Sequence, residues 1–189
     1  MKTMTIFKSV MMVAFVALFS TSIISCGGDD GDEPEQTPGV ETGVINPNAK
    51  PKTNFEYFVP YTGWYTDVTQ ADTYMKNNTS FVNSYTNSVG TEWWSTTQPQ
   101  IVTTYYFKDG KMWSLDVTYK WYDKQDLEYL VAQTQKKFNV KMNNIYTTDE
   151  GILYTGTFKV DGHEIGVTVM GMPTFKQMQV TLHAVDMAN

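Results

Sequence analysis

Two Asp-Gly dipeptides, Asp109-Gly110 and Asp161-Gly162, each divide a long run of β-branched and aromatic residues. Asp-Gly suits the positive φ angles of a two-residue hairpin turn, and residues of these types favour strands. The sequence therefore predicts two β-hairpins, whose apolar residues must be buried on one face of an antiparallel sheet. The four predicted strands are residues 101–108, 111–119, 152–160 and 163–170.

The two-residue turns also predict the register of each hairpin. Residues on one face of a strand alternate with those on the other, so the register decides which residues are buried. The apolar positions of the two hairpins match when one is shifted by 52 residues, as from Trp113 to Ile165. This match predicts a tandem duplication. The expected pairs are Tyr106 with Trp113, Thr104 with Leu115 and Val102 with Val117, and then Phe158 with Ile165, Gly156 with Val167 and Tyr154 with Val169.

Each hairpin is expected to follow a helix that begins shortly after a Trp-Tyr pair. Asp123 is a suitable N-cap for a helix over residues 124–139, where apolar residues recur every three or four positions. A weaker helical pattern begins after Asp67 and continues to Tyr85. Residues 77–80 are Asn-Asn-Thr-Ser, which have low helix propensity and favour a break in this first helix.

Two further strands complete the expected fold, residues 55–61 at its start and residues 174–185 at its end. The expected order is β-α-β-β-α-β-β-β, with two helices on one face of an antiparallel sheet. This α+β fold contains two helix-plus-hairpin units, residues 64–119 and 121–170, before the closing strand. A ferredoxin-like core with extra strands is one topology that fits this order.

Residues 53–189 form the expected single domain. They hold 24 of the 27 aromatic residues, and their number is usual for one domain. Residues 26–52 contain four of the seven prolines and almost no large apolar side chains. Such a segment cannot bury enough surface to offset its loss of conformational entropy. We therefore expect residues 26–52 to be an acidic, disordered tether.

The first 25 residues have the pattern of a bacterial signal peptide. Lys2 and Lys8 accompany an apolar run, residues 10–19, that is shorter than the roughly 20 residues of a membrane span. The tetrapeptide Ile23-Ile24-Ser25-Cys26 resembles a lipobox. This resemblance implies a lipoprotein that is cleaved before Cys26 and acylated, for example with palmitate, at the thiol and the new N-terminus. Two or more acyl chains anchor a protein stably in a membrane.

An acidic run follows the lipobox, with five acidic residues among residues 29–35. It is similar to the export signal of surface lipoproteins from Bacteroidota. The resemblance implies an outer-membrane protein that is exposed at the cell surface. The alternative is a lipoprotein that faces the periplasm, in which the acidic run is a solvated and self-repelling spacer.

The composition argues against several functional classes. The chain has one cysteine, two histidines, no arginine and a net charge of −6. A single cysteine can form neither an intrachain disulfide nor a Cys-rich zinc site. An acidic chain without arginine is a poor partner for nucleic acid, because binding to phosphate depends on lysine and arginine. We therefore expect no cofactor, no metal site and no nucleic-acid partner.

Few titratable residues suggest catalysis. His163 follows a hairpin turn, and His183 alternates with polar residues on a strand face that we expect to be exposed. Asp149 and Glu150 precede a glycine in a segment typical of a solvated turn. The sequence contains no nucleotide-binding loop, nucleophile elbow or zinc-protease motif. It therefore favours a protein that is not an enzyme.

The segment 90–100 holds the first candidate for a ligand site. Trp93 and Trp94 are adjacent, and Glu92 and Gln98 lie nearby in the sequence. Neighbouring residues of a strand point to opposite faces, so we expect at most one of the two tryptophans in the core. The other could stack on a sugar ring or anchor a protein partner. The alternative is that both tryptophans fill the space between sheet and helix.

A second candidate surface lies on the reverse face of the first hairpin. With the expected register, Tyr105, Phe107 and Met112 project away from the helices and form an apolar patch, which is typical of an interface. The alternative is that the opening strand, the segment 90–100 or a partner copy covers this patch.

These features support three hypotheses about function. The first is a lipid-anchored, non-catalytic binding protein of the cell envelope, whose ligand is a glycan or a protein. The second is a structural, inhibitory or accessory subunit of an envelope complex. The third is a glycan hydrolase, which would need two carboxylates facing each other across a cleft.

Overall fold

The computed structural model describes residues 45–187. The signal peptide, Cys26, the acidic run and most of the tether therefore lie outside the described residues. Within residues 45–187, no helix is both long and apolar enough to cross a membrane.

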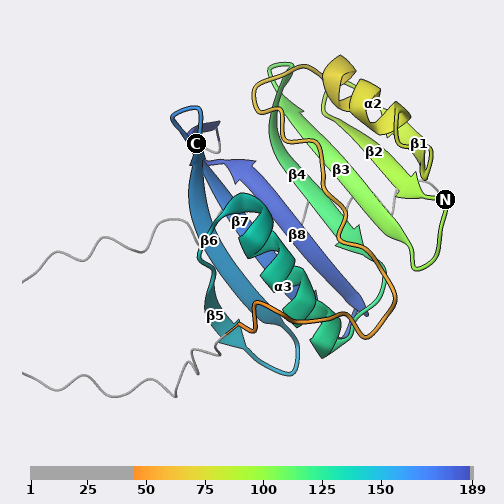
Figure 1. Ribbon diagram of the computed structural model, residues 1–189. Coiled ribbons are helices and arrows are strands. Elements are labelled where there is room, and N and C mark those ends of the chain that lie inside the picture. The colour runs from red at the N-terminus through yellow and green to blue at the C-terminus, as the bar shows by residue number, and fades with distance from the viewer. Residues whose placement is uncertain (1–44, 188–189) are drawn as a thin grey trace, which may run out of the picture. The chain divides into compact units, whose positions relative to one another are not determined.

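Eight antiparallel strands form a single sheet, and two α-helices lie on one of its faces (Figure 1). The expected α+β fold class is therefore confirmed. The order of strands in the sheet is β1-β2-β3-β4-β8-β7-β6-β5. The elements are α2 (Val68–Lys76), β1 (Phe81–Thr86), β2 (Gly90–Ser95), β3 (Ile101–Lys108), β4 (Lys111–Tyr119), α3 (Lys124–Phe138), β5 (Asn143–Thr147), β6 (Ile152–Val160), β7 (His163–Met172), β8 (Gln177–Ala184) and a 3₁₀ turn, η1 (Val185–Met187).

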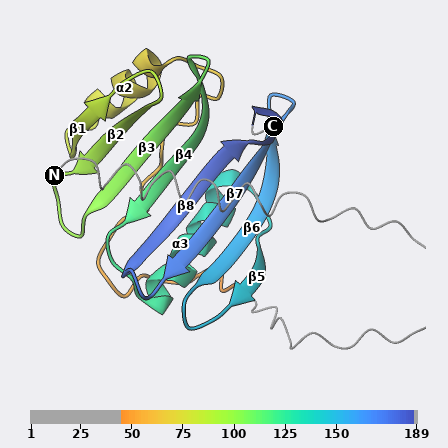
Figure 2. The same cartoon turned by 180° about the vertical axis from the view of Figure 1, so that it is seen from behind.

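The strand order divides the sheet into two halves that meet at the β4–β8 pair. The first half is α2 with β1 to β4, and the second half is α3 with β5 to β8. Figure 2 shows the opposite side of the sheet, on which no described helix lies. We call this side the open face, and the side that carries α2 and α3 the helical face.

The expected order of elements was wrong in two respects. Residues 55–61 form no strand, and each helix is followed by four strands, where two were expected after the first helix and three after the second. Strands β1 and β2 occupy positions at which the sequence predicted the end of the first helix and a connecting segment. A ferredoxin-like core needs a strand before its first helix, and residues 45–67 contain none.

Both helices begin at the predicted aspartates. The Asp67 carboxylate accepts hydrogen bonds from the amides of Thr69 and Gln70, and α2 ends at Lys76 with Asn77 as its C-cap, at the start of the stretch where a break was expected. The Asp123 carboxylate accepts a hydrogen bond from the Gln125 amide, and α3 then runs for 15 residues. The predicted second helix is therefore confirmed to within one residue at its end.

Residues 45–66, which we call the N-terminal strap, cross the helical face between α3 and α2 (Figure 1). Phe55 packs against Tyr119 with 5.5 Å between ring centroids, and Phe58 packs against Phe81 at 4.7 Å. Phe55, Tyr57, Phe58 and Tyr61 all reach the core, and the adjacent residues 57 and 58 cannot both do so in a strand, whose side chains alternate between faces. This spacing explains why an irregular strap forms where the sequence predicted a strand.

The strap contacts the rest of the domain from its first residues. Residues 45–52 of the strap belong to the segment that the sequence predicted to be a disordered tether. Ile45 packs against the hydrophobic core. The amides of Lys52 and Thr53 donate hydrogen bonds to Asp126 Oδ1, at 2.6 and 2.9 Å. Asp126 lies in the first turn of α3 and is fully buried, so these bonds satisfy a carboxylate that has no access to water.

The second hairpin has the predicted register, whereas the first does not. Phe158 pairs with Ile165, Gly156 with Val167 and Tyr154 with Val169, as expected. In the first hairpin a β-bulge inserts Trp113 between Met112 and Ser114. The bulge shifts all pairs beyond it by one residue, so that every side chain of β3 changes face relative to the prediction. The observed pairs are Phe107 with Met112, Tyr106 with Ser114, Tyr105 with Leu115, Thr104 with Asp116, Thr103 with Val117 and Val102 with Thr118.

Candidate functional site

The three residues expected to form an exposed patch, Tyr105, Phe107 and Met112, lie in the core. Tyr105 and Met112 have no exposed surface, and Phe107 is 6% exposed. The Tyr105 hydroxyl accepts a hydrogen bond from the Tyr61 amide at 2.9 Å and lies 3.4 Å from Met75 Sδ in α2. The prediction that these three residues form an exposed patch was wrong, because the β-bulge turns them toward α2 and the strap.

The two adjacent tryptophans of β2 point to opposite faces. Trp93 is 3% exposed, and its indole N–H donates to Thr91 Oγ1, which itself donates to Asp72 of α2. Trp93 therefore belongs to the helical face. Trp94 is half-buried on the open face, between Val82 of β1 and Val102 of β3. The expectation that at most one tryptophan enters the core is confirmed.

Charged groups fix the Trp94 ring at both its polar edge and its face. The indole N–H donates to Glu92 Oε1 at 2.6 Å, and Lys120 Nζ lies 5.7 Å from the ring centroid. A cation at this distance is attracted by the ring quadrupole. Glu92 and Trp94, two of the predicted site residues, are therefore in contact. Gln98 is exposed in the connection between β2 and β3 and has no hydrogen bond to either of them.

A continuous line of polar side chains, which we call the polar row, crosses the open face. Each member is the direct cross-strand partner of the next, from one edge of the sheet to the other. Strands lie about 4.8 Å apart, so the row extends over about 34 Å. Its members, in sheet order, are Tyr85, Glu92, Thr104, Asp116, Thr181, Thr168, Thr155 and Asn143.

Asp116 lies near the centre of the polar row, where the two halves meet. Its carboxylate accepts hydrogen bonds from Thr181 Oγ1 at 2.6 Å and from the Tyr106 hydroxyl at 3.1 Å. Burial raises the pKa of Asp116 to about 6, and the two hydrogen bonds partly oppose this rise by stabilising the ionised form. Asp116 is therefore a fixed, ionised acceptor at neutral pH.

His183 lies next to this centre, opposite Ser114 of β4 and Gly166 of β7. A β-carbon at Gly166 would lie 2.4 Å from the imidazole, so the absence of a side chain there makes room for the ring. Burial lowers the pKa of His183, which favours its neutral form. His183 lies on the open face, where no described helix covers it, but it is half-buried rather than exposed as the sequence predicted.

His163 takes part in a separate exposed cluster at one end of the sheet. His163 Nδ1 lies 2.9 Å from Asp186 Oδ2, and the ring packs on Tyr65 with 4.3 Å between centroids. The Tyr65 hydroxyl also donates to Asp186. This cluster joins the strap to β7 and η1.

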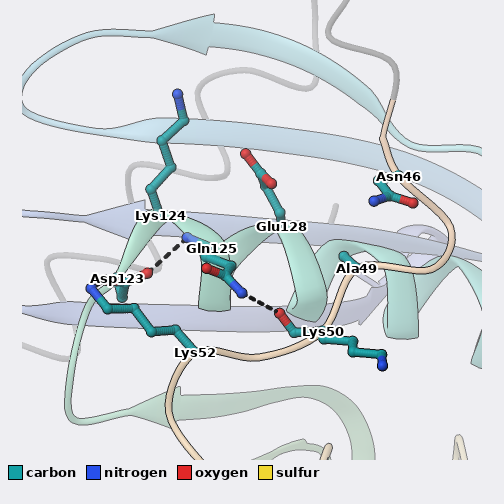
Figure 3. A pocket seen from close by; sticks show the side chains of 8 residues that line it. All are labelled: Asn46, Ala49, Lys50, Lys52, Asp123, Lys124, Gln125 and Glu128. Carbon is teal, nitrogen blue, oxygen red and sulfur yellow. Dashed lines mark hydrogen bonds and ion pairs between the residues drawn. The ribbon is translucent and has the colours of Figure 1, made fainter.

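A hollow of about 620 Å³ lies between the strap and the first turns of α3 (Figure 3). Lys52 Nζ and Asp123 Oδ2 are 2.7 Å apart, and Gln125 Nε2 donates to the Lys50 carbonyl at 3.0 Å. The hydrogen bond and charge of Asp123 raise the pKa of Lys52, and those of Lys52 lower the pKa of Asp123. The polar groups of this hollow thus bind one another and hold the strap against α3.

Sequence patterns did not reveal the polar row. Its strands are alternately polar and apolar, which indicates an exposed face, but the line appears only when the registers of all eight strands are known. Among residues 45–187, no group of three or more His, Cys, Asp and Glu side chains could hold a metal ion. Comparison of the chain with protein-family models, curated proteins and solved structures found no match.

Proposed function

We propose that this chain is a lipid-anchored, non-catalytic binding protein of the cell envelope, and that its ligand, a glycan or a protein, binds the open face of the sheet. One observation carries the proposal: the described helices and the strap lie on only one of the two faces of the sheet. The helices and the strap cover the helical face, whereas no described helix lies on the open face, where Trp94 is half-buried and the central members of the polar row, Thr104, Asp116 and Thr168, are 8–9% exposed. A half-buried tryptophan with fixed polar neighbours is typical of a recognition surface.

The anchor rests on the sequence of the first 35 residues. Cys26 is the only cysteine, it ends a lipobox-like tetrapeptide, and an acidic run follows it. We place the protein in the outer membrane with its domain at the cell surface, and a periplasmic orientation is the alternative. Cells fed an alkyne analogue of palmitate should label the wild-type protein but not Cys26→Ala. Label that persists in Cys26→Ala would contradict the anchor. Protease added to intact cells tests the orientation, because it should cleave a domain at the cell surface and leave a periplasmic domain intact.

The non-catalytic role is supported by the surroundings of the two carboxylates on the open face. Glu92 and Asp116 are separated by Thr104 and hence by two strand spacings, about 10 Å. Each carboxylate is already engaged, Glu92 by Trp94 and Asp116 by Thr181 and Tyr106. Glycan hydrolysis through this pair is the alternative, and release of reducing ends from polysaccharide would support it over simple binding.

We also infer an internal duplication, with a unit of one helix and four strands rather than one helix and one hairpin. The motif Asn-x-Tyr-Thr-x-x-x-Gly occurs at residues 83–90 and again at residues 144–151. Both copies begin with a bulged edge strand in which an Asn amide donates to a Thr hydroxyl at 3.1 Å. Both end in a turn closed by an amide-to-Gly carbonyl bond of 2.9 Å. These shared details support a common origin of the two halves.

A photoreactive residue on the open face tests the binding proposal in cells. Benzophenone-alanine in place of Thr118, which lies between Val102 and Gln179 on the open face, should yield an adduct with the ligand. The same residue in place of Glu128, which is exposed on α3, serves as the matched control. Adducts at both positions, or at neither, would contradict a ligand site on the open face.

A role as an inhibitory, structural or accessory subunit is the second candidate, supported by the edges of the sheet. Val82, Tyr85 and Val89 are 53%, 39% and 65% exposed on or beside β1, and Ile145 and Tyr146 are 46% and 37% exposed on β5. Exposed apolar side chains at a sheet edge are typical of protein contacts. Co-purification of an envelope protein that is lost with Ile145→Lys, at the sheet edge farther from Trp94, would favour this role.

A further inference from the structure

We propose that the polar row is the binding site of an extended, uncharged polysaccharide that lies across the strands. This inference rests on the proposed binding function of the open face and names its ligand class. Two observations carry it: the unbroken line of hydrogen-bonding side chains across all eight strands, and the charge of that line.

The polar row has the length and direction to follow a linear ligand. Its eight members are successive cross-strand partners, so a ligand perpendicular to the strands would meet one polar side chain at each step of about 4.8 Å. Aromatic rings lie at the β1–β2 end, where Tyr85 is in the row and Trp94 lies beside Glu92. The Tyr85 ring, which is 39% exposed, could stack on a sugar face while the row holds the rest of the chain, and a sugar on the Trp94 ring would first have to displace Lys120, whose Nζ lies 5.7 Å from the ring centroid.

Several members of the row have unused hydrogen-bonding capacity. Within residues 45–187, no hydrogen bond to another side chain or to the backbone engages the hydroxyls of Thr104, Thr155 and Thr168; Thr155 is half-buried, whereas Thr104 and Thr168 are only 9% and 8% exposed. A hydroxyl both donates and accepts, as do the hydroxyls of a sugar. The row thus offers partners to a ligand that is covered with hydroxyl groups.

Asp116 is the fixed acceptor at the centre of the row. Thr181 and Tyr106 each hold one carboxylate oxygen, so the group does not need to be ordered when a ligand binds. Each oxygen keeps a lone pair that can accept from a sugar hydroxyl, and hydrogen bonds to a charged acceptor are stronger than neutral ones.

The charge of the surface selects against anionic ligands. The polar row contains two carboxylates, Glu92 and Asp116, and no lysine. The residues paired along its two sides add no lysine either; they are Val82, Trp94, Val102, Thr118, Gln179, Met170 and Leu153 on one side, and Gly90, Tyr106, Ser114, His183, Gly166 and Thr157 on the other. A phosphate, sulfate or uronic acid would therefore meet two carboxylates, and the cation described nearby, Lys120, already lies 5.7 Å from the Trp94 ring centroid beside Glu92.

The composition of the row also favours a glycan over a protein partner. The centre of a protein interface is poor in Asp, Glu and Ser and rich in aromatic residues and methionine. The four central strands instead contribute Thr104, Asp116, Thr181 and Thr168 to the polar row, with Thr118 and Ser114 on its two sides. A protein partner would bury these groups, each of which would then need a matching polar group.

Isothermal titration calorimetry with the full chain in detergent tests the inference. The probes are the neutral hexasaccharides of cellulose, amylose, mannan and xylan, and the anionic hexamer of galacturonic acid. We expect at least one neutral hexasaccharide to bind and the galacturonic acid hexamer not to bind. Trp94→Ala and Thr168→Val should each weaken binding by about tenfold, because each removes one contact and leaves the rest of the row intact.

Matched variants separate loss of contact from loss of structure. Phe175→Ala removes an aromatic side chain that is 68% exposed in the β7–β8 turn, and Thr69→Val removes an exposed hydroxyl from α2. Both should bind as the wild type does, and all four variants should retain the wild-type circular dichroism spectrum. Equal weakening by Thr69→Val and Thr168→Val would overturn the inference.

The outcome also distinguishes this inference from the broader proposal. If no neutral hexasaccharide binds while benzophenone-alanine at position 118 still forms an adduct with an envelope protein, the glycan inference fails and the binding function stands. If position 118 forms no adduct and no hexasaccharide binds, both fail. Binding of the galacturonic acid hexamer alone would overturn the inference through its charge.

Discussion

The two halves of the sheet share one order of elements but bury their helical faces by different means. In the second half, α3 has 15 residues, and six of its side chains are buried. In the first half, α2 has 9 residues, and only Ala71 and Met75 are buried. The strap supplies the missing cover, and its aromatic residues fill the space that a longer helix would occupy.

The sheet under each helix reflects this difference. Beneath α3, a β-carbon at Gly171 would lie 2.6 Å from Leu127, and one at Gly156 would lie 2.6 Å from the Lys141 carbonyl. The absence of side chains at these positions lets α3 and the chain after it approach closely. Beneath α2, the sheet instead presents Tyr105 and Trp93, large side chains that reach up to the helix and strap. The two halves therefore have the same topology but different packing. In the second half a long helix lies close to the sheet over glycines, and in the first half a short helix lies over large aromatic side chains.

The largest expected effect is that of removing the aromatic cover of the first half. Tyr105→Ala leaves a cavity beneath α2 and removes the acceptor of the Tyr61 amide. Substitutions of this kind cost about 4 kcal/mol, which is much of the stability of a typical domain. Chemical denaturation should therefore show a lower free energy of unfolding for Tyr105→Ala.

Tyr105→Phe serves as its control. It keeps the ring and removes only the hydroxyl that binds the Tyr61 amide, so its cost should be nearer to 1 kcal/mol, that of one hydrogen bond. Equal costs for the two variants would mean that the strap is held by this hydrogen bond rather than by packing.

The second expected effect concerns the second half of the sheet, where α3 and the chain after it lie close to glycines of the strands. Gly156→Ala places a methyl group against the backbone carbonyl of Lys141, which cannot move without the chain after α3. Overpacking of this kind costs about 2 kcal/mol. Gly171→Ala should cost less, because the nearest atom belongs to the flexible Leu127 side chain. Thermal unfolding of the two variants measures the difference, and the reverse order would show that α3, and not the segment after it, limits the spacing.

How much the sequence predicted also differs between the halves. In the second half, the N-cap Asp123, the length of α3 and the register of the β6–β7 hairpin were all predicted. Each depends on residues close together in the chain. In the first half, the register of β3 and β4 was wrong, because aromatic residues occupy both alternating positions, with Tyr105 and Phe107 on one and Tyr106 on the other. Periodicity cannot identify the buried face of such a strand or the bulge at Trp113.

In the candidate site, too, the sequence predicted only what depends on residues that are close together in the chain. The sequence predicted that at most one of Trp93 and Trp94 lies in the core, because neighbouring residues of a strand point to opposite faces, but it did not identify which one. The partners of Asp116 were not predicted, because Thr181 comes from a strand 65 residues later and the pairing of β4 with β8 leaves no local signal. Tyr105, Phe107 and Met112 were misplaced by a single inserted residue.

A smaller difference in the free energy of unfolding is expected between variants of the two copies of the Asn-x-Tyr-Thr motif. The Asn83 amide donates to Thr86, Thr91 and the carbonyls of Tyr85 and Glu92, whereas the Asn144 amide donates to Thr147 alone. Asn83→Ala should therefore cost about 1 kcal/mol, and Asn144→Ala should cost less than half of that. Urea unfolding of the two single variants provides the measurement. Equal costs would mean that the motif acts only through its own turn and not through the neighbouring strand.

The smallest expected effect is at Asp186, which links the strap of the first half to β7 of the second. Hydrogen bonds from Tyr65 and then His163 hold the pKa of Asp186 below its ordinary value of 3.8. A lowered pKa means that the unfolded chain takes up a proton first as the pH falls, so the stabilisation is complete above pH 3.8 and is lost as the pH falls through the folded value.

Asp186→Asn should therefore reduce the free energy of unfolding at neutral pH and have no effect in strong acid. The Asp186 side chain is exposed and screened by solvent, so the difference should be small and should shrink further with added salt. Measuring urea unfolding of both proteins from neutral pH down to below pH 3.8 tests the sign. If Asp186→Asn is instead more stable than the wild type at neutral pH, Asp186 acts through repulsion from other carboxylates rather than through Tyr65 and His163, and the two halves are joined at the β4–β8 pair without this link.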